Sequence, residues 1–222
     1  VRESDAKPVQ TGTLFEGGEG GVRLVAVDGY RVAIREEKAA EAVEAMNFVV
    51  PGKSLGEVLK LLSDDEESKV SLQVGRRHIL FNIGRYTLIS RLLEGEFLDY
   101  RAAIPASASM EVICKTRDFI ESVERVSLLI TDRMKSPIRC VFDTDEISLS
   151  CSTAIGRASD QFTARVSGDP VEIGFNNRFL LDALRNTEGD EVRIQLNGPL
   201  SPMKILPREG DAFLFLVLPV RL

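Results

Sequence analysis

One order of secondary-structure elements recurs along this chain. The stretch from Phe48 to Leu93 and the stretch from Val171 to the C-terminus share it: a short apolar strand, an amphipathic helix, and then strands in which apolar and polar residues alternate. Residues Met110 to Val166 repeat the order once more, whereas Thr11 to Arg35 shows only the later strands. Three complete units and one truncated unit therefore restrict the chain to a duplicated α+β architecture.

Paired units predict two domains, each built from antiparallel strands with two helices on one face. The segment from Phe97 to Ser109 breaks the periodicity with Pro105 and small residues, so we expect the domains to span 1–105 and 106–222. Because the first unit is truncated, we also expect the N-terminus to lie inside a domain.

Two of the predicted helices have a clear apolar face. In the helix expected from Ser54 to Leu62, Ser54 stands three residues before Glu57, which is the spacing of a capping box. The helix expected from Arg117 to Ile130 has apolar residues at three- and four-residue spacing, each worth roughly 1.5–3 kcal/mol when buried. This face must therefore pack on a sheet. A single strand is predicted farther on, from Asp160 to Val166.

Composition indicates a folded chain that is not held to nucleic acid by its overall charge. Apolar residues make up 44% of the sequence and charged residues 28%, which excludes disordered and collagen-like architectures. The net charge is −6, so a binder that depends on many phosphate contacts is disfavoured, although a locally basic surface is not. No apolar run is long enough to cross a bilayer, and the three cysteines have no CxxC spacing. We expect no membrane contact and a reducing, cytoplasmic environment.

No arrangement of residues indicates catalysis. The single histidine, His78, follows two arginines at a predicted turn and has no evident acid-base partner. The acidic cluster from Asp64 to Glu67 lacks the alternating ligands and central glycine of a calcium loop, so a solvated turn is the simpler interpretation. The glycines between Gly17 and Gly21 predict a reversal between strands rather than a phosphate cradle, because no helix pattern begins there. We expect no catalytic residue, no metal and no cofactor.

Several separated segments of the sequence resemble one known family, the bacterial sliding clamp, which is the beta subunit of DNA polymerase III. These segments are LVAVDGYRVAI (Leu24–Ile34), LEGEFLDYR (Leu93–Arg101), IGFNNRFLLDAL (Ile173–Leu184), DEVRIQLNGPLSP (Asp190–Pro202) and LVLPVRL (Leu216–Leu222). They occur in the family's order and span nearly the whole chain. The chain accordingly resembles a C-terminal part of such a clamp, with most of the second domain and all of the third.

The resemblance implies the DNA clamp fold and a non-catalytic processivity factor of DNA replication. In that family, three similar domains per subunit form a head-to-tail homodimer, a ring that encircles double-stranded DNA without reading its sequence, with helices inside and sheets outside. The half of the dimer interface that this chain would retain lies around Leu128 and Leu129 and the nearby edge strand.

The resemblance also implies a pocket between the second and third domains. There the DNA polymerase III alpha subunit, the clamp loader and other proteins with a clamp-binding motif insert a short segment with a glutamine and two apolar side chains. The matching positions are Gly29, Tyr30, Arg31, Val32, Ala103, Asn176, Phe179, Leu200, Pro202, Leu216, Leu218, Pro219, Val220 and Arg221. Apolar members suit a socket, and the polar groups of Arg31 and Asn176 suit peptide hydrogen bonds. Tyr30 stands where the family commonly has His, and Val32 where it has Leu.

Cations near helix starts or on polar helix faces are the candidates for contact with DNA. Lys53 matches a lysine of the family, and the others are Lys7, Arg117, Arg125 and Arg178. Helix N-termini favour phosphate, but ordinary solvated charges remain an equal interpretation for all except Lys53. Glu121 and Glu124 lie among these cations, so we expect weak, sliding contacts.

Two other classes of function stay open. A small enzyme of unidentified chemistry on a repeated α+β scaffold would require two or more titratable residues converging in a closed cleft. A sequence-specific DNA binder would require a basic recognition helix, and none of the predicted helices is one.

Overall fold

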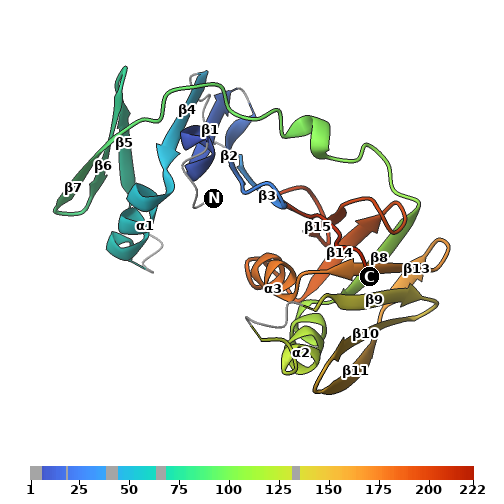
Figure 1. Cartoon of the computed structure of the whole chain (residues 1–222). Coiled ribbons are helices and arrows are strands. Elements are labelled where there is room, and N and C mark those ends of the chain that lie inside the picture. The colour runs from blue at the N-terminus through green and yellow to red at the C-terminus, as the bar shows by residue number, and fades with distance from the viewer. Residues whose placement is uncertain (1–6, 19, 39–44, 64–68, 132–135) are drawn as a thin grey trace. The chain divides into compact units, whose positions relative to one another are not determined.

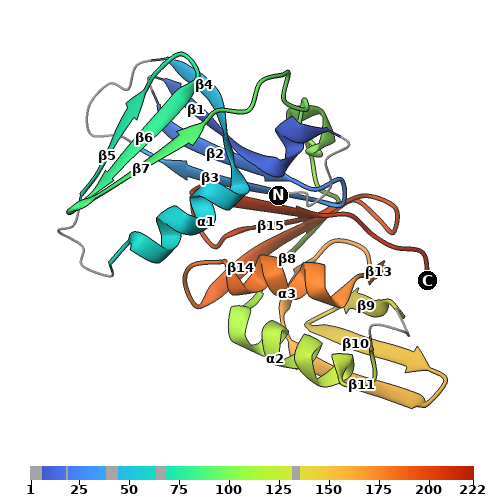
Figure 2. The ribbon, with the colours of Figure 1, turned by 60° about the vertical axis from the view of Figure 1, so that its left-hand side comes forward.

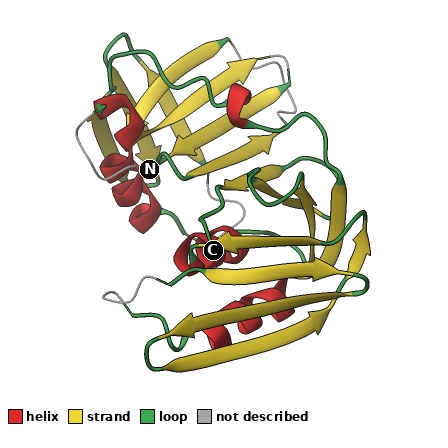
Figure 3. Cartoon of the chain, turned by 45° about the vertical axis from the view of Figure 1, so that its right-hand side comes forward, coloured by secondary structure: helices red, strands yellow, loops and turns green. Residues whose placement is uncertain are grey.

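The computed structural model describes residues 7–18, 20–38, 45–63, 69–131 and 136–222 (Figure 1). These residues form two compact units. Unit 1 comprises Val1–Gly29 and Ile34–Asp99, and unit 2 comprises Tyr30–Ala33 and Tyr100–Leu222. Both combine helices with antiparallel strands, which confirms the predicted α+β class (Figure 3). The predicted domain limits, 1–105 and 106–222, stay a prediction.

Unit 1 contains one truncated and one complete copy of the repeat. Its elements are the 3-10 helix η1 (Pro8–Thr11), β1 (Gly12–Gly18), β2 (Gly21–Val27), most of β3 (Arg31–Glu37), β4 (Met46–Pro51), α1 (Gly52–Leu61), β5 (Val70–Val74), β6 (His78–Ile83) and β7 (Tyr86–Arg91). Strand β1 pairs with β2 and with β4, and β6 pairs with β5 and with β7, all antiparallel. The reversal predicted at the glycine cluster is confirmed, because Gly18 faces Gly21 across the β1–β2 pair.

Unit 2 contains two complete copies of the repeat. Its elements are η2 (Arg101–Ala103), β8 (Met110–Lys115), α2 (Thr116–Ser127), β9 (Ile138–Asp143), β10 (Glu146–Thr153), β11 (Gly156–Thr163), β12 (Arg165–Ser167), β13 (Val171–Phe175), α3 (Asn177–Arg185), β14 (Glu191–Leu196), β15 (Met203–Pro207) and β16 (Phe213–Val217). One sheet has the order β11-β10-β9-β13, and in the other β12, β8, β14, β15 and β16 follow one another. Each sheet therefore takes a strand from both copies. Helices α2 and α3 lie side by side (Figure 2).

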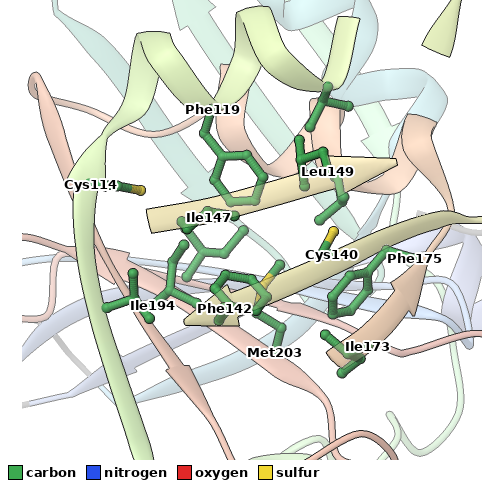
Figure 4. Close-up of a cluster of buried hydrophobic side chains, with 14 of the residues drawn as sticks. Cys114, Phe119, Cys140, Phe142, Ile147, Leu149, Ile173, Phe175, Ile194 and Met203 are labelled. Carbon is green, nitrogen blue, oxygen red and sulfur yellow. The ribbon is translucent and has the colours of Figure 1, made fainter. Parts of the chain in front are cut away.

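The core of unit 2 is filled by side chains from both sheets and both helices. Phe119 of α2 is fully buried and points toward Ile147 and Leu149 of β10 (Figure 4). Its ring centroid lies 5.3 Å from that of Phe162, on the neighbouring strand β11. The apolar spacing of α2 is thus explained by burial against the sheet, as its sequence predicted.

Two predicted boundaries were wrong. Ser54 is not the N-cap of α1: the helix begins earlier, at Gly52 after the extended Pro51, and the Ser54 Oγ lies 2.7 Å from the Ser90 Oγ. Helix α2 ends at Ser127 rather than Ile130, although Ile130 still packs against the core.

The strand expected from Asp160 to Val166 is two strands. Between β11 and β12, the Ala164 amide donates to the Asp145 carbonyl instead of to a sheet partner, at 3.0 Å. On either side of it the chain pairs with different sheets, β11 with β10 and β12 with β8. The acidic cluster from Asp64 to Glu67 lies outside the described residues.

The segment that precedes β8 is anchored on unit 2 by polar side chains. The nearly buried Lys204 donates from Nζ to the Pro105 carbonyl at 2.9 Å, and the Asn197 Oδ1 accepts from the Ser109 amide at 2.7 Å. Burial, together with the nearby Arg193, lowers the pKa of Lys204. The hydrogen bond to Pro105 offsets part of the cost of burying this ammonium group.

Replacing Phe119 by Ala should lower the free energy of unfolding of unit 2 by about 3–5 kcal/mol, because the change removes a fully buried ring and leaves a cavity. Urea unfolding followed by circular dichroism measures this loss. Leu128→Ala is the control: its side chain is 81% exposed, so the change should be within about 0.5 kcal/mol. Equal effects of the two substitutions would contradict the assignment of the core.

Candidate functional site

Three separate segments of unit 2 meet around the side chain of Phe179 on α3. The Tyr30 ring stacks on the Phe179 ring with centroids 5.8 Å apart and an interplanar angle of 27°. The Arg31 guanidinium carbon lies 4.3 Å from the centroid of the same ring. An arginine over an aromatic face contributes about 0.5–1 kcal/mol at an exposed position. The start of β3 is thereby held against α3.

Asp182 completes this contact one helical turn after Phe179. Its carboxylate accepts a hydrogen bond from Arg31 Nη1 at 2.5 Å, in an ion pair. The Asp182 side chain is 60% exposed, so the pair contributes at most about 1 kcal/mol to stability. Its consequence is geometric, because it fixes the guanidinium over Phe179. The sequence did not single out Asp182, although its spacing from Phe179 puts both on one helix face.

Asn176 sets where α3 begins. Its side-chain Oδ1 accepts hydrogen bonds from the amides of Arg178 at 3.0 Å and Phe179 at 3.3 Å, which makes it the N-cap of the helix. The cap satisfies amides that the first helical turn leaves without carbonyl partners. Since the oxygen is used in the cap, the side-chain NH₂ is the group of Asn176 that can donate to a ligand.

The C-terminal segment from Leu218 to Leu222, called the tail below, is the third part of the site. The Leu218 amide donates to the Tyr30 carbonyl at 3.0 Å, and the Val220 amide donates to the Gly174 carbonyl at 2.9 Å. Gly174 lies in β13, two residues before the Asn176 cap. The tail is therefore joined to the start of β3 on one side and to β13 on the other.

A pocket of about 330 Å³ opens between the start of α3 and the tail. Its lining residues are Ile130, Thr131, Ser136, Pro137, Asn176, Asn177, Arg178, Phe179, Val220 and Arg221. The lining includes both apolar and polar side chains, and its two charged residues, Arg178 and Arg221, are both cations. Such a lining suits a ligand that offers apolar side chains together with hydrogen-bond acceptors.

The predicted peptide-binding residues thus fall into distinct groups. Four line the pocket, namely Asn176, Phe179, Val220 and Arg221. Tyr30 and Arg31 pack on the Phe179 ring, and the Leu218 amide donates to the Tyr30 carbonyl. Val32 and Leu216 are buried side chains. Leu200 is 83% exposed, Pro202 and Pro219 are partly exposed, Ala103 belongs to η2, and Gly29 belongs to unit 1.

The sequence did not single out Ile130 or Pro137 as pocket residues. Ile130 was read only as part of a helix face, and Pro137 lies just before β9. Neither carries a chemical group that marks a ligand site. Their role depends on contacts across the fold, which no local pattern reveals.

The predicted DNA-facing cations of α2 are paired with acids. Arg117 donates to Glu121 at 2.7 Å, and Arg125 donates to Asp160 at 2.8 Å. The hydrogen bond from Arg117 lowers the pKa of the Glu121 carboxyl. The polar face of α2 therefore has mixed charge. The other three candidates are exposed: Arg178 on α3, Lys53 on α1, and Lys7 just before η1.

The dimer-interface candidates follow α2 in unit 2. Leu128 is largely exposed, and Leu129 is partly buried. Strand β11 is the last strand of its sheet, beyond β10. An apolar side chain close to an edge strand is a combination that suits pairing with another chain.

The groups that usually perform catalysis are scattered. His78 is the exposed first residue of β6. The three cysteines are buried, which raises the pKa of Cys114 to about 12, with Asp118 and Glu191 adding to the effect, and raises the pKa of Cys140 and Cys151. Thiols with raised pKa values are poor nucleophiles. Within the described ranges, no three His, Cys, Asp or Glu side chains gather as a metal site would require. The helices of these ranges also include none with the length and apolarity to span a membrane.

Family models match nearly the whole chain. The model described as the DNA polymerase III beta subunit, central domain, matches residues 1–99. The model described as the DNA polymerase III beta subunit, C-terminal domain, matches residues 101–221. These matches confirm the resemblance seen in the sequence.

Individual relatives give the same result. The beta sliding clamp of Staphylococcus aureus is 30% identical over 223 residues, which cover 100% of this chain and 59% of the relative. The solved sliding clamp of Bacillus subtilis has a TM-score of 0.95 at 30% identity, and the match covers 100% of this chain and 59% of that clamp. A sliding clamp from Bartonella birtlesii bound to griselimycin has a TM-score of 0.91 at 29% identity, with 100% of this chain covering 61% of it. The chain thus spans about 59% of the length of the curated relatives it matches.

Replacing Asn176 by Ala should lower the free energy of unfolding of unit 2 by about 1 kcal/mol, because two helix amides lose their acceptor. Thermal or urea unfolding measures the change. Asn177→Ala is the control, since Asn177 is the first residue inside the helix and does not cap it. A loss that is no larger for Asn176 than for Asn177 would contradict the capping role.

Proposed function

Because the chain belongs to the DNA polymerase III beta subunit family, we propose that it acts as part of a sliding clamp in DNA replication. In this proposal the protein tethers the replicative polymerase to DNA and docks partner proteins through a peptide-binding site around Phe179. It has no catalytic role of its own. The observation that carries the proposal is the packing of Tyr30 and Arg31 on the Phe179 ring, which lines a mixed apolar and polar pocket together with the tail.

The proposed ligands are short segments of partner proteins that carry a glutamine and two apolar side chains. The partners are the DNA polymerase III alpha subunit, the clamp loader and other proteins with such a motif. The clamp of Bartonella birtlesii solved with griselimycin supports a ligand-binding site in this family. The Asn176 NH₂ and the Arg221 guanidinium would donate to peptide carbonyls, and Phe179 and Val220 would contact the apolar anchors.

The affinity follows from a small number of contacts. Two apolar anchors buried at roughly 1.5–3 kcal/mol each, with a few hydrogen bonds, must offset an association cost of at least about 4 kcal/mol. The expected dissociation constant is therefore in the micromolar range. Weak single contacts allow partners to exchange on one clamp.

The proposed contact with double-stranded DNA is weak and independent of sequence. On α2, each cation is close to an acid, so few phosphate charges would be neutralised at once. Retention on DNA would come from encirclement by the homodimer ring, in which the Leu128 and Leu129 region with the β11 edge would form one half of each interface. We place this protein in the cytoplasm, where replication of bacterial DNA occurs.

A synthetic peptide with a glutamine and two apolar anchors should bind the chain with a micromolar dissociation constant, and Phe179→Ala should weaken binding by about 10- to 100-fold because a 1.5–3 kcal/mol contact is lost. Isothermal titration calorimetry measures both values. Tyr86→Ala is the control, since Tyr86 in unit 1 is also an aromatic ring under an arginine but is exposed. Unchanged affinity in the Phe179 variant would refute the site.

A further inference from the structure

Gly174 occupies an outward-facing position of β13 and is nevertheless buried. The strand alternates: Ile173 and Phe175 are buried in the core, whereas Glu172 on the other face is exposed. Gly174 shares the face of Glu172, so solvent exposure is expected there. The tail lies over it instead, and this cover accounts for the burial of Gly174.

The contact between the tail and Gly174 leaves no space for a side chain. A Cβ atom at Gly174 would lie 2.6 Å from the Val220 carbonyl oxygen and 2.8 Å from the Leu222 Cδ2. Both separations are shorter than van der Waals contact. The backbone of Gly174 is outside the left-handed region, so its conformation suits any residue. Glycine is therefore needed here for close approach alone.

The same contact places one wall of the pocket. Val220, whose amide donates to the Gly174 carbonyl, lines the pocket together with the adjacent Arg221. Phe179 and Asn176 line it from the start of α3. The separation between these two walls consequently depends on how closely the tail approaches β13.

We propose that Gly174 is a positioning residue for the peptide-binding site, because its missing side chain lets the tail lie on β13 and so sets the width of the pocket. The inference rests on the proposed function and deepens it. Gly174 itself need not touch the peptide, since its effect passes through Val220 and Arg221.

A methyl group at Gly174 should displace the tail rather than disrupt unit 2. Leu222 is more than half exposed, and neither Leu222 nor Val220 belongs to the buried core cluster. Residues 218–222 belong to none of the helices and strands of unit 2, so the tail can move without moving one of these elements. The strain of an added Cβ is relieved at the part that is least costly to move, and β13 remains paired with β9.

The test is Gly174→Ala, with Gly18→Ala as the matched control. Gly18 also lies in a strand, but a Cβ there would meet no atom within 4 Å. Three quantities are measured: the affinity for the synthetic peptide, the exchange rate of the Val220 amide hydrogen, and the melting temperature. For Gly174→Ala we expect the peptide to bind about ten-fold more weakly and the Val220 amide to exchange at least about ten-fold faster. The melting temperature should stay within about 4 °C of that of the unsubstituted chain, a shift that corresponds to roughly 1 kcal/mol. Gly18→Ala should leave affinity and Val220 exchange unchanged.

Each other outcome is decisive. Faster Val220 exchange with unchanged affinity would overturn the inference while leaving the peptide site in place. An unchanged exchange rate of the Val220 amide, or a large drop in melting temperature, would show that the added methyl group does not displace the tail. Either result would also overturn the inference. Failure of the unsubstituted chain to bind the peptide would refute the proposed function itself, and the role of Gly174 with it.

Discussion

Backbone hydrogen bonds to the tail are the interaction on which the candidate site depends. The amides of Leu218 and Val220, two residues apart in the tail, donate to the carbonyl of Tyr30, just before β3, and to the carbonyl of Gly174 in β13. Backbone bonds fix position without demanding particular side chains. The side chains of the tail are thus free to form a binding surface, and the backbone bonds hold that surface beside α3.

The repeat explains why such distant segments meet. In unit 2, each copy contributes its first strand to the sheet formed by the later strands of the other copy: β8 pairs with β14, and β13 pairs with β9. This exchange brings α2 and α3 side by side and leaves the free edge of β13 available to the tail. An ion pair from Arg185 to Glu124 joins the two helices at their polar faces. The site in unit 2 is asymmetric, because the tail follows the second copy and bonds to the first strand of that copy, β13.

Sequence periodicity predicted most of the fold and little of the site. The repeated order of strands and helices and the apolar face of α2 followed from the sequence pattern, because these elements bury one face in a core. The Ser54 cap failed because a competing bond to Ser90 and an earlier helix start were not visible locally. The site residues came from resemblance to a family rather than from any pattern. Asp182 and Gly174 were missed because their roles arise from contacts with residues far away in the sequence.

The most direct test of the account is a nuclear magnetic resonance titration of the methyl-labelled chain with the glutamine-containing peptide. We predict that the largest shifts occur at the methyl groups of Leu218 and Val220, with those of Leu59 and Ile89 on the exposed surface of unit 1 unmoved. Large shifts at Leu59 and Ile89, with Leu218 and Val220 unchanged, would contradict a binding site built from α3, the start of β3 and the tail.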